Sequence, residues 1–193
     1  MNKIKVLLGL PCGGVVHMKT MVSVVHNLLR NVEILDFLPV AGALGPENRN
    51  ALAQEAVDGG YTHLWLVDAD MRFHEDALAR LLAHEADVVG CAYNRRGLPI
   101  ETTVRIEDEH GVVGIPTGPL PTELFACYAI GSGCQLIATS ALRQIAKPWF
   151  CTAYVGELFM DDAVWFGRGT RQAGLQTLCD PTIECKHLGE YEY

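Results

Sequence analysis

The sequence predicts an α/β protein with three layers, in which helices cover both faces of a mostly parallel sheet. Over residues 4–92, short apolar runs alternate with segments of helical period, which is typical of strand–helix–strand units. The third apolar run ends in two carboxylates, at the kind of strand end where α/β sheets bind ligands. With 193 residues, 49% of them hydrophobic, the chain can build one domain with a substantial core.

Four strands and three helices are expected in the first half of the chain. The predicted strands cover residues 4–10, 32–40, 61–68 and 87–92, and the predicted helices cover residues 15–30, 46–57 and 74–84. In the first helix, the residues at helical spacing, which are typical of a buried face, are Met18, Met21, Val22, Val25, Leu28 and Leu29.

Shorter elements are expected after residue 92, where the alternation stops. The sequence predicts a hairpin from 102–106 and 112–115, core strands at 125–130 and 134–138, a short helix at 140–145, a longer helix at 159–174, and terminal strands at 175–179 and 182–185. Residues 190–193 are predicted to form a mobile tail or a lid.

Composition narrows the class of protein. The net charge of -8 and the pI near 5.3 argue against non-specific binding to nucleic acid. Seven scattered cysteines without a Cys-x-x-Cys pair favour reduced thiols in a cytoplasmic protein over a disulfide framework or a zinc ribbon. No apolar run reaches membrane-spanning length, and the N-terminal run is too short for a signal peptide, so we expect no membrane insertion.

The candidate site begins with Asp68 and Asp70, at the end of the third predicted strand. Residues i and i+2 of a strand face the same way, so both carboxylates can point at one ligand. Acids that end a buried run are typical of a cation site, and a divalent ion that also binds phosphate needs only one or two such ligands. These two acids therefore predict a metal site.

Arg49 is a second candidate, in the first turn of a predicted helix. A cation there opposes the helix dipole, which favours an outside partner such as a phosphate. A solvated surface arginine is the alternative.

Several short motifs occur in an order that resembles small GT-A fold glycosyltransferases, of the kind related to family 2 and common in bacteria and phages. These motifs are Arg49-Asn50, Gly60-Tyr61, Val67-Asp68-Ala69-Asp70, Gly131-Ser132-Gly133, Asp161-Asp162, Gly174, and His187 with Gly189. The resemblance covers most of the chain. It implies a single GT-A domain, with a nucleotide-binding half at 1–92, an acceptor-binding and catalytic half at 93–189 and a tail at 190–193.

The resemblance further implies a nucleotide-diphosphate-sugar as donor and Mn²⁺ or Mg²⁺ as cofactor. Asp68 and Asp70 would hold the ion on the diphosphate, with His187 as an additional ligand. A surface histidine is the alternative for His187. A nitrogen ligand beside carboxylates favours Mn²⁺ over Mg²⁺.

The same resemblance assigns residues around the donor. Pro11, Asp36 and Arg49 would surround the nucleotide, and Gly133 with its neighbours would line the sugar pocket or the acceptor cleft, where a missing side chain makes room. Residues 93–96 follow a strand end and could contact acceptor or phosphate.

Asp161 and Asp162 resemble the acidic pair that supplies the base in inverting relatives. A carboxylate within hydrogen-bond reach of the acceptor hydroxyl can take its proton as the sugar transfers. The alternative is helix capping, since acids in a first turn favour the dipole. Between the two neighbours we expect Asp162 to be the base.

The predicted function is metal-dependent transfer of a sugar to an unidentified acceptor, with inversion. The acceptor could be a glycan, a protein, a small molecule or a modified nucleic-acid base, and the oligomeric state is not predicted. The alternatives are a nucleotidyltransferase and a non-catalytic module that binds nucleotide-sugars or glycans. A nucleotidyltransferase should carry a lysine or arginine in the loop after the first strand, and residues 11–14 contain neither.

Overall fold

The computed structural model describes residues 3–31 and 34–189. Its helices are α1 (Met18–Arg30), α2 (Gly45–Asp58), α3 (Ala77–Ala83), α4 (Thr139–Leu142) and α5 (Asp162–Gln172). Its strands are β1 (Val6–Cys12), β2 (Leu35–Ala41), β3 (His63–Val67), β4 (Met71–Phe73), β5 (Val88–Cys91), β6 (Ile106–Glu107), β7 (Val113–Gly114), β8 (Phe125–Cys127), β9 (Cys134–Ala138), β10 (Ala153–Val155), β11 (Leu158–Met160), β12 (Thr177–Asp180) and β13 (Cys185–His187).

A seven-stranded sheet, counted over the described residues, forms the centre of the molecule in the order β2-β1-β3-β9-β5-β12-β8. Strands β2, β1, β3, β5 and β12 run parallel, whereas β9 and β8 are antiparallel to their neighbours. The predicted α/β class with a mostly parallel sheet is confirmed. The carboxyl ends of β1 and β3, which lie side by side, open onto the same edge of the sheet.

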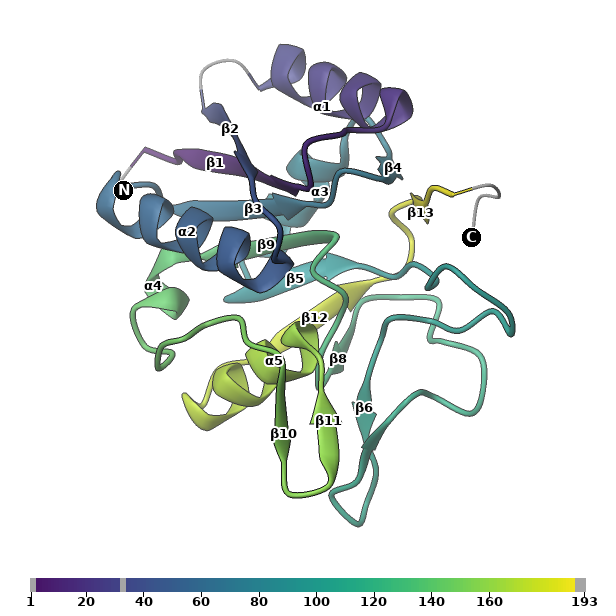
Figure 1. Ribbon diagram of the computed structural model, residues 1–193. Coiled ribbons are helices and arrows are strands. Elements are labelled where there is room, and N and C mark those ends of the chain that lie inside the picture. The colour runs from purple at the N-terminus through teal and green to yellow at the C-terminus, as the bar shows by residue number, and fades with distance from the viewer. Residues whose placement is uncertain (1–2, 32–33, 190–193) are drawn as a thin grey trace.

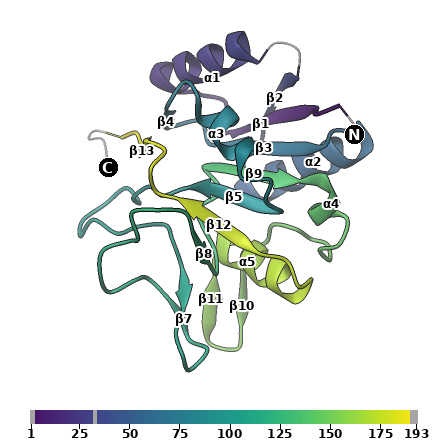
Figure 2. The same cartoon turned by 180° about the vertical axis from the view of Figure 1, so that it is seen from behind.

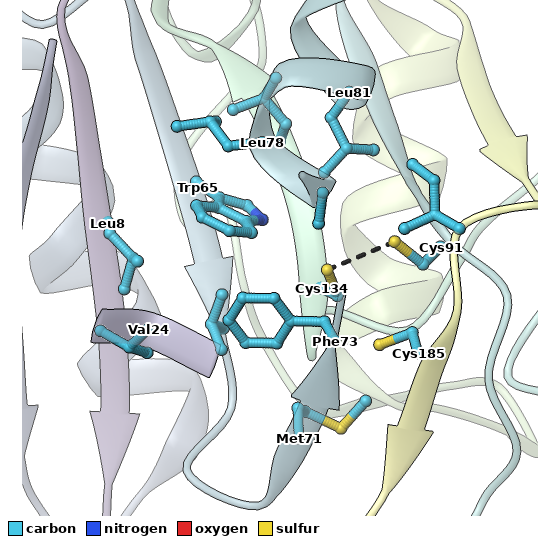
Figure 3. Packing of buried hydrophobic residues seen from close by; sticks show 14 of the residues in the cluster. Leu8, Val24, Trp65, Met71, Phe73, Leu78, Leu81, Cys91, Cys134 and Cys185 are labelled. Carbon is cyan, nitrogen blue, oxygen red and sulfur yellow. Dashed lines mark hydrogen bonds between the residues drawn. The ribbon is translucent and has the colours of Figure 1, made fainter. Parts of the chain in front are cut away.

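Helices cover both faces of this sheet, which gives the three predicted layers (Figure 1, Figure 2). On one face, α1 and α3 share a hydrophobic cluster with Leu8 and Trp65 (Figure 3). On the other face, α2, α4 and α5 share a cluster with Leu7 and Leu64. Neighbouring residues of one strand thus point to opposite faces, as the pleat of a strand requires, and both faces are dry because both are covered.

Helix α1 buries a different face from the one that its apolar spacing predicts. Its apolar residues Met18, Val22, Val25 and Leu29 are exposed, so their assignment to a buried face is wrong. The buried face instead combines the apolar Val24 with polar side chains that bind the backbone of residues 73–78. The Ser23 hydroxyl accepts from the amide of Phe73 (3.3 Å), and Asn27 accepts from the amide of Leu78 (3.3 Å) and donates to the carbonyl of His74 (3.1 Å). Buried backbone groups need such partners, and this need outweighs the apolar periodicity.

Three short strands were not predicted. Strand β4 begins directly after the two acids and pairs antiparallel with β13, which places the C-terminal segment against the end of β3. Strands β10 and β11 form a hairpin before α5, so that helix begins at Asp162 rather than at residue 159. The predicted tail, 190–193, and the predicted start of the second strand at residue 32 lie outside the described residues.

The described part of the chain contains no helix with the length and apolar character needed to cross a membrane.

Candidate functional site

The two focal acids lie in the turn between β3 and β4. The amide of Asp68 donates to the carbonyl of Gly133 (3.1 Å), and the amide of Met71 donates to the carbonyl of Asp68 (3.3 Å). Gly133 directly precedes β9, which pairs with β3, so the sheet itself fixes the first acid. The turn then carries Asp70 to the start of β4.

The pairing of β4 with β13 brings His187 to Asp70. The amide of Leu188 donates to the carbonyl of Asp70 (2.7 Å), and Nε2 of His187 lies 3.3 Å from Oδ2 of Asp70. Arg96 lies at the same oxygen, also at 3.3 Å. Burial by itself raises the pKa of Asp70, but the hydrogen bond and charge of His187, together with Arg96, outweigh it and leave that pKa below its ordinary value.

Arg49 links the first acid to the acids of α5. Its guanidinium donates to Oδ1 of Asp68 and to Oδ2 of Asp162, each at 2.5 Å, and its side chain is only 12% exposed. Burial lowers the pKa of Arg49, but the charges of the two carboxylates raise it by more than burial lowers it. The net shift is upward, so the side chain stays cationic. The partners of Arg49 in this structure are therefore two carboxylates of the site, and the alternative of a solvated arginine does not hold.

The neighbours Asp161 and Asp162 have different surroundings. Asp161 is the N-cap of α5, and its Oδ1 accepts from the amide of Val164 (2.9 Å). Asp162 faces Arg49. Its pKa is raised mainly by burial, with further increases from the charges of Asp68 and Asp161 that together outweigh Arg49. The capping role predicted as an alternative thus falls to Asp161, and Asp162 is left facing the site.

Two cavities meet at the Arg49–Asp68 pair. The larger, of about 630 Å³, is lined by the ends of β1 and β3 and by the C-terminal segment, including Pro11, Asp70 and His187. The smaller, of about 150 Å³, is lined by residues that include Arg105, Ser132, Asp161 and Asp162. Arg49 and Asp68 line both. The wall between the cavities therefore consists of the charged pair itself.

Tyr93 explains the glycines of the segment before β9. A side chain at Gly131 would begin 2.2 Å from the Tyr93 hydroxyl, and one at Gly133 would begin 2.7 Å from it and 3.2 Å from Oδ2 of Asp68. The amide of Gly133 donates to the same hydroxyl (2.9 Å). Gly133 was predicted to line the sugar pocket or the acceptor cleft. It packs against Tyr93 and Asp68 and lines neither of the two cavities.

Asp36 is the one predicted nucleotide contact that the structure places elsewhere. It pairs in register with Leu7, near the amino end of β1, whereas the cavity opens at the carboxyl end of that strand. Its carboxylate accepts from the hydroxyl of Tyr61 (2.9 Å) and lies 3.8 Å from Nζ of Lys5. The apolar run around Asp36 predicts a strand, but it does not tell at which end of the sheet this acid lies.

The predicted metal ligands fit a divalent ion in part. Oδ2 of Asp70 and Nε2 of His187 are as close as two ligands of one ion, and Nδ1 of His187 is buried without a hydrogen-bond partner among the described residues. Asp68 fits less well than Asp70 and His187. Its Oδ1 already accepts a hydrogen bond from Arg49, and its carboxylate oxygens do not lie within 4.8 Å of the ligand atoms of both Asp70 and His187. Asp70 and His187 could hold the ion, while the remaining Oδ2 of Asp68 could join after a side-chain movement.

Arg105 is a residue that reasoning from the sequence missed. It lies just before β6, is half-buried, and its hydrogen bonds to described residues go to the carbonyls of Thr102 and Val104, each at 3.1 Å. Burial lowers its pKa from the ordinary arginine value. In the sequence, a single arginine in a predicted hairpin is typical of a solvated surface side chain. Arg105 lines the smaller cavity because its segment packs beside the start of α5.

Comparisons with known proteins bear on the fold. No family model and no curated protein sequence matches the chain. The chain is similar to the crystal structure of A197 from STIV, with a TM-score of 0.67 and 16% identity over 96% of this chain and 86% of that chain. It is also similar to a putative glucose-1-phosphate thymidylyltransferase from Bacillus anthracis, with a TM-score of 0.53 and 8% identity over 96% and 89% of the two chains. Together with the strand order, these similarities show that the chain has a GT-A-like fold.

Proposed function

We propose that the protein is a metal-dependent glycosyltransferase that moves a sugar from a nucleotide-diphosphate-sugar to an acceptor hydroxyl. The observation that carries the proposal is the arrangement of two cavities on either side of Arg49 and Asp68, with Asp70 and His187 in one and Asp162 in the other. A transferase that joins two substrates needs such adjoining sites, and it needs its acids at the junction.

The larger cavity is proposed to take the donor. Its volume of about 630 Å³ is ample for a nucleotide, and it lies at the carboxyl ends of β1 and β3, where α/β sheets bind such ligands. Asp70 and His187 would hold the divalent ion, and that ion, when bound, would neutralise charge on the leaving diphosphate. Arg96, at the rim beside Asp70, is placed to bind a diphosphate oxygen.

Asp162 is proposed as the base that takes the acceptor proton. It lines the smaller cavity, while Asp70 lines the larger one, so base and leaving group would flank the reacting carbon from opposite sides. This arrangement supports inversion at that carbon. The raised pKa of Asp162 suits the role, because a stronger base accepts a proton more readily in the transition state. Arg49 would hold the carboxylate in place and release it as the donor phosphates compete for the guanidinium.

The smaller cavity favours an acceptor that carries a negative charge near its reactive hydroxyl. Arg95 and Arg105 line it beside the carboxylates of Asp68, Asp161 and Asp162. Asp161 and Glu101 attract Arg105 from a distance, but no described carboxylate lies within ion-pair distance of it, and its hydrogen bonds go to carbonyls. Ser132 adds a buried hydroxyl that makes no hydrogen bond to any described residue. A uronic acid or a sugar phosphate would satisfy both groups. Pairs of neutral and anionic sugars, compared as acceptors, should show higher kcat/KM for the anionic member, and Arg105→Met should abolish that preference.

The test of the proposed reaction is product analysis with a panel of nucleotide-diphosphate-sugars, in which water serves as the acceptor until a better one is found. We expect slow, Mn²⁺-dependent release of nucleoside diphosphate from at least one donor. The rival reaction, nucleotidyl transfer, would instead release pyrophosphate from a nucleoside triphosphate and a sugar 1-phosphate. Pyrophosphate release without any nucleoside diphosphate from donors would overturn the proposal in favour of that rival.

A further inference from the structure

Three cysteines from distant parts of the chain meet in the core beneath the site. Cys91 ends β5, Cys134 begins β9 and Cys185 begins β13, and their sulfur atoms all lie within 4.8 Å of one another (Figure 3). The sulfurs of Cys91 and Cys134 are 3.4 Å apart. All three residues are buried. Among the described residues, this is the one group of three or more cysteine, histidine or acidic side chains that converges so closely.

The backbone that carries these thiols is fixed by strand pairing. Gly90 lies opposite Gln135 in the antiparallel pair of β5 and β9, so Cys91 and Cys134 occupy the next cross-strand position. Cys185 lies opposite Phe73 in the pair of β13 and β4. Because three separate strands hold them, the sulfurs need no rearrangement to converge, and little ordering entropy opposes the binding of a ligand.

Trp65 lies beside the three cysteines in the core. Trp65 is fully buried and its indole Nε1 makes no hydrogen bond to any described residue, yet Figure 3 shows that this nitrogen lies on the side of the ring that faces the cysteines. Donors around a coordinating sulfur are the usual outer-shell support of a metal site.

We propose that Cys91, Cys134 and Cys185 bind a soft d¹⁰ metal ion, Cu(I) in first place, at a site separate from the carboxylate site. Sulfur ligands select soft ions and offer nothing to Mg²⁺ or Mn²⁺, which prefer oxygen. Structural Zn²⁺ is almost always held by four ligands, and the described residues supply only these three converging groups, which suits three-coordinate Cu(I) better. Each thiol that binds as a thiolate gives its proton to solvent as the sulfur–metal bond forms.

Such an ion would join β13 to the main sheet. Cys185 lies two residues before His187, and Cys134 directly follows Gly133, which holds the backbone of Asp68. Binding to the folded state alone would stabilise this edge of the molecule, on which both acids depend.

The test uses the full, reduced chain, handled without oxygen, with Mn²⁺ in excess to occupy carboxylates. Cu(I) is titrated against a chromophoric Cu(I) chelator, and X-ray absorption of the loaded protein reports the ligands. We expect about one Cu(I) per chain, sulfur as the sole coordinating element and a raised thermal midpoint. Cys134→Ser should lose the ion, whereas Cys151→Ser, a matched change outside the cluster, should keep it.

Three results would overturn the proposal. They are a failure to compete with the chelator, nitrogen or oxygen as the main ligands in the absorption spectrum, and a mass lower by about two daltons that maps to a Cys91–Cys134 disulfide. The absorption measurement needs only the parent protein, so it decides the matter even if Cys134→Ser fails to fold.

Discussion

Asp162 is the residue whose chemistry is most sharply defined by its surroundings. Its carboxylate is buried and its pKa is raised, mainly by burial, while its neighbour Asp161 caps α5. Asp162→Asn keeps the shape of the side chain and removes the proposed base, so we expect transfer to fall by about 10²-fold or more while donor binding is retained. Steady-state kinetics and calorimetry measure the two effects. Asp161→Asn is the matched control, because asparagine also caps helices and should leave the rate close to that of the parent.

The pH dependence of transfer should report the same carboxylate. Only the ionised form accepts a proton, so the rate should fall as pH falls through the raised pKa of Asp162. Arg49 lowers that pKa, hence Arg49→Met should raise it further and move the acid limb of the profile to higher pH. Arg49→Lys keeps a charge without the fork that reaches both acids, and its profile should lie between the two. An acid limb at the same pH in all three proteins would assign the base to another residue.

Helix α5 positions Asp162, and Gly167 determines how closely that helix approaches the sheet. A side chain at Gly167 would begin 2.4 Å from the carbonyl oxygen of Tyr128 and 2.7 Å from Cβ of Ala129. Gly167→Ala gains helix propensity of about 1 kcal/mol, but the clash with backbone costs about 1–3 kcal/mol. We therefore expect a net loss of about 1 kcal/mol in denaturant unfolding and a lower rate of transfer.

The control for the added methyl group is Gly118→Ala, at a bend outside the helices, where an added side chain meets nothing within 4 Å. Its stability should stay within about 0.5 kcal/mol of the parent. If Gly167→Ala were as stable as this control, the close approach of α5 to the segment after β8 would not hold in solution.

The elements also show what the sequence could predict. Periodicity located β1, α1, β2, α2 and β3 to within a few residues, since each is long enough to show its pattern. Strands β4, β10 and β11 have only three residues each, too few for any period. The exposed apolar face of α1 was unpredictable for another reason, because the backbone groups that Ser23 and Asn27 satisfy belong to a segment about fifty residues away.

The site was predicted unevenly for similar reasons. Asp68 and Asp70 can be predicted from the local sequence, because they are acids at the end of an apolar strand. The approach of His187 depends on the pairing of β13 with β4, and the pairing of Arg49 with Asp162 joins residues 113 positions apart. Neither follows from local pattern. The resemblance supplied His187 as a ligand, whereas the ion pair of Arg49 with Asp162 was not predicted. Arg105 lay outside those motifs and was missed.

At the scale of the whole molecule, the sheet brings two cavities, the proposed donor and acceptor sites, to one edge, with Arg49 and Asp68 between them. Donor binding should depend on a divalent ion, because Asp68 and Asp70, which line the larger cavity, would otherwise repel the diphosphate. Asp36, at the opposite end of the same sheet, should have no part in it.

The most direct test is calorimetric titration of nucleotide-diphosphate-sugars into the parent, Asp70→Asn and Asp36→Asn, each with and without Mn²⁺. We predict that at least one donor binds the parent and Asp36→Asn only with Mn²⁺, and that Asp70→Asn binds it at least about 10-fold more weakly. Binding of equal strength to all three proteins, with or without the ion, would contradict a metal-dependent donor site at Asp70.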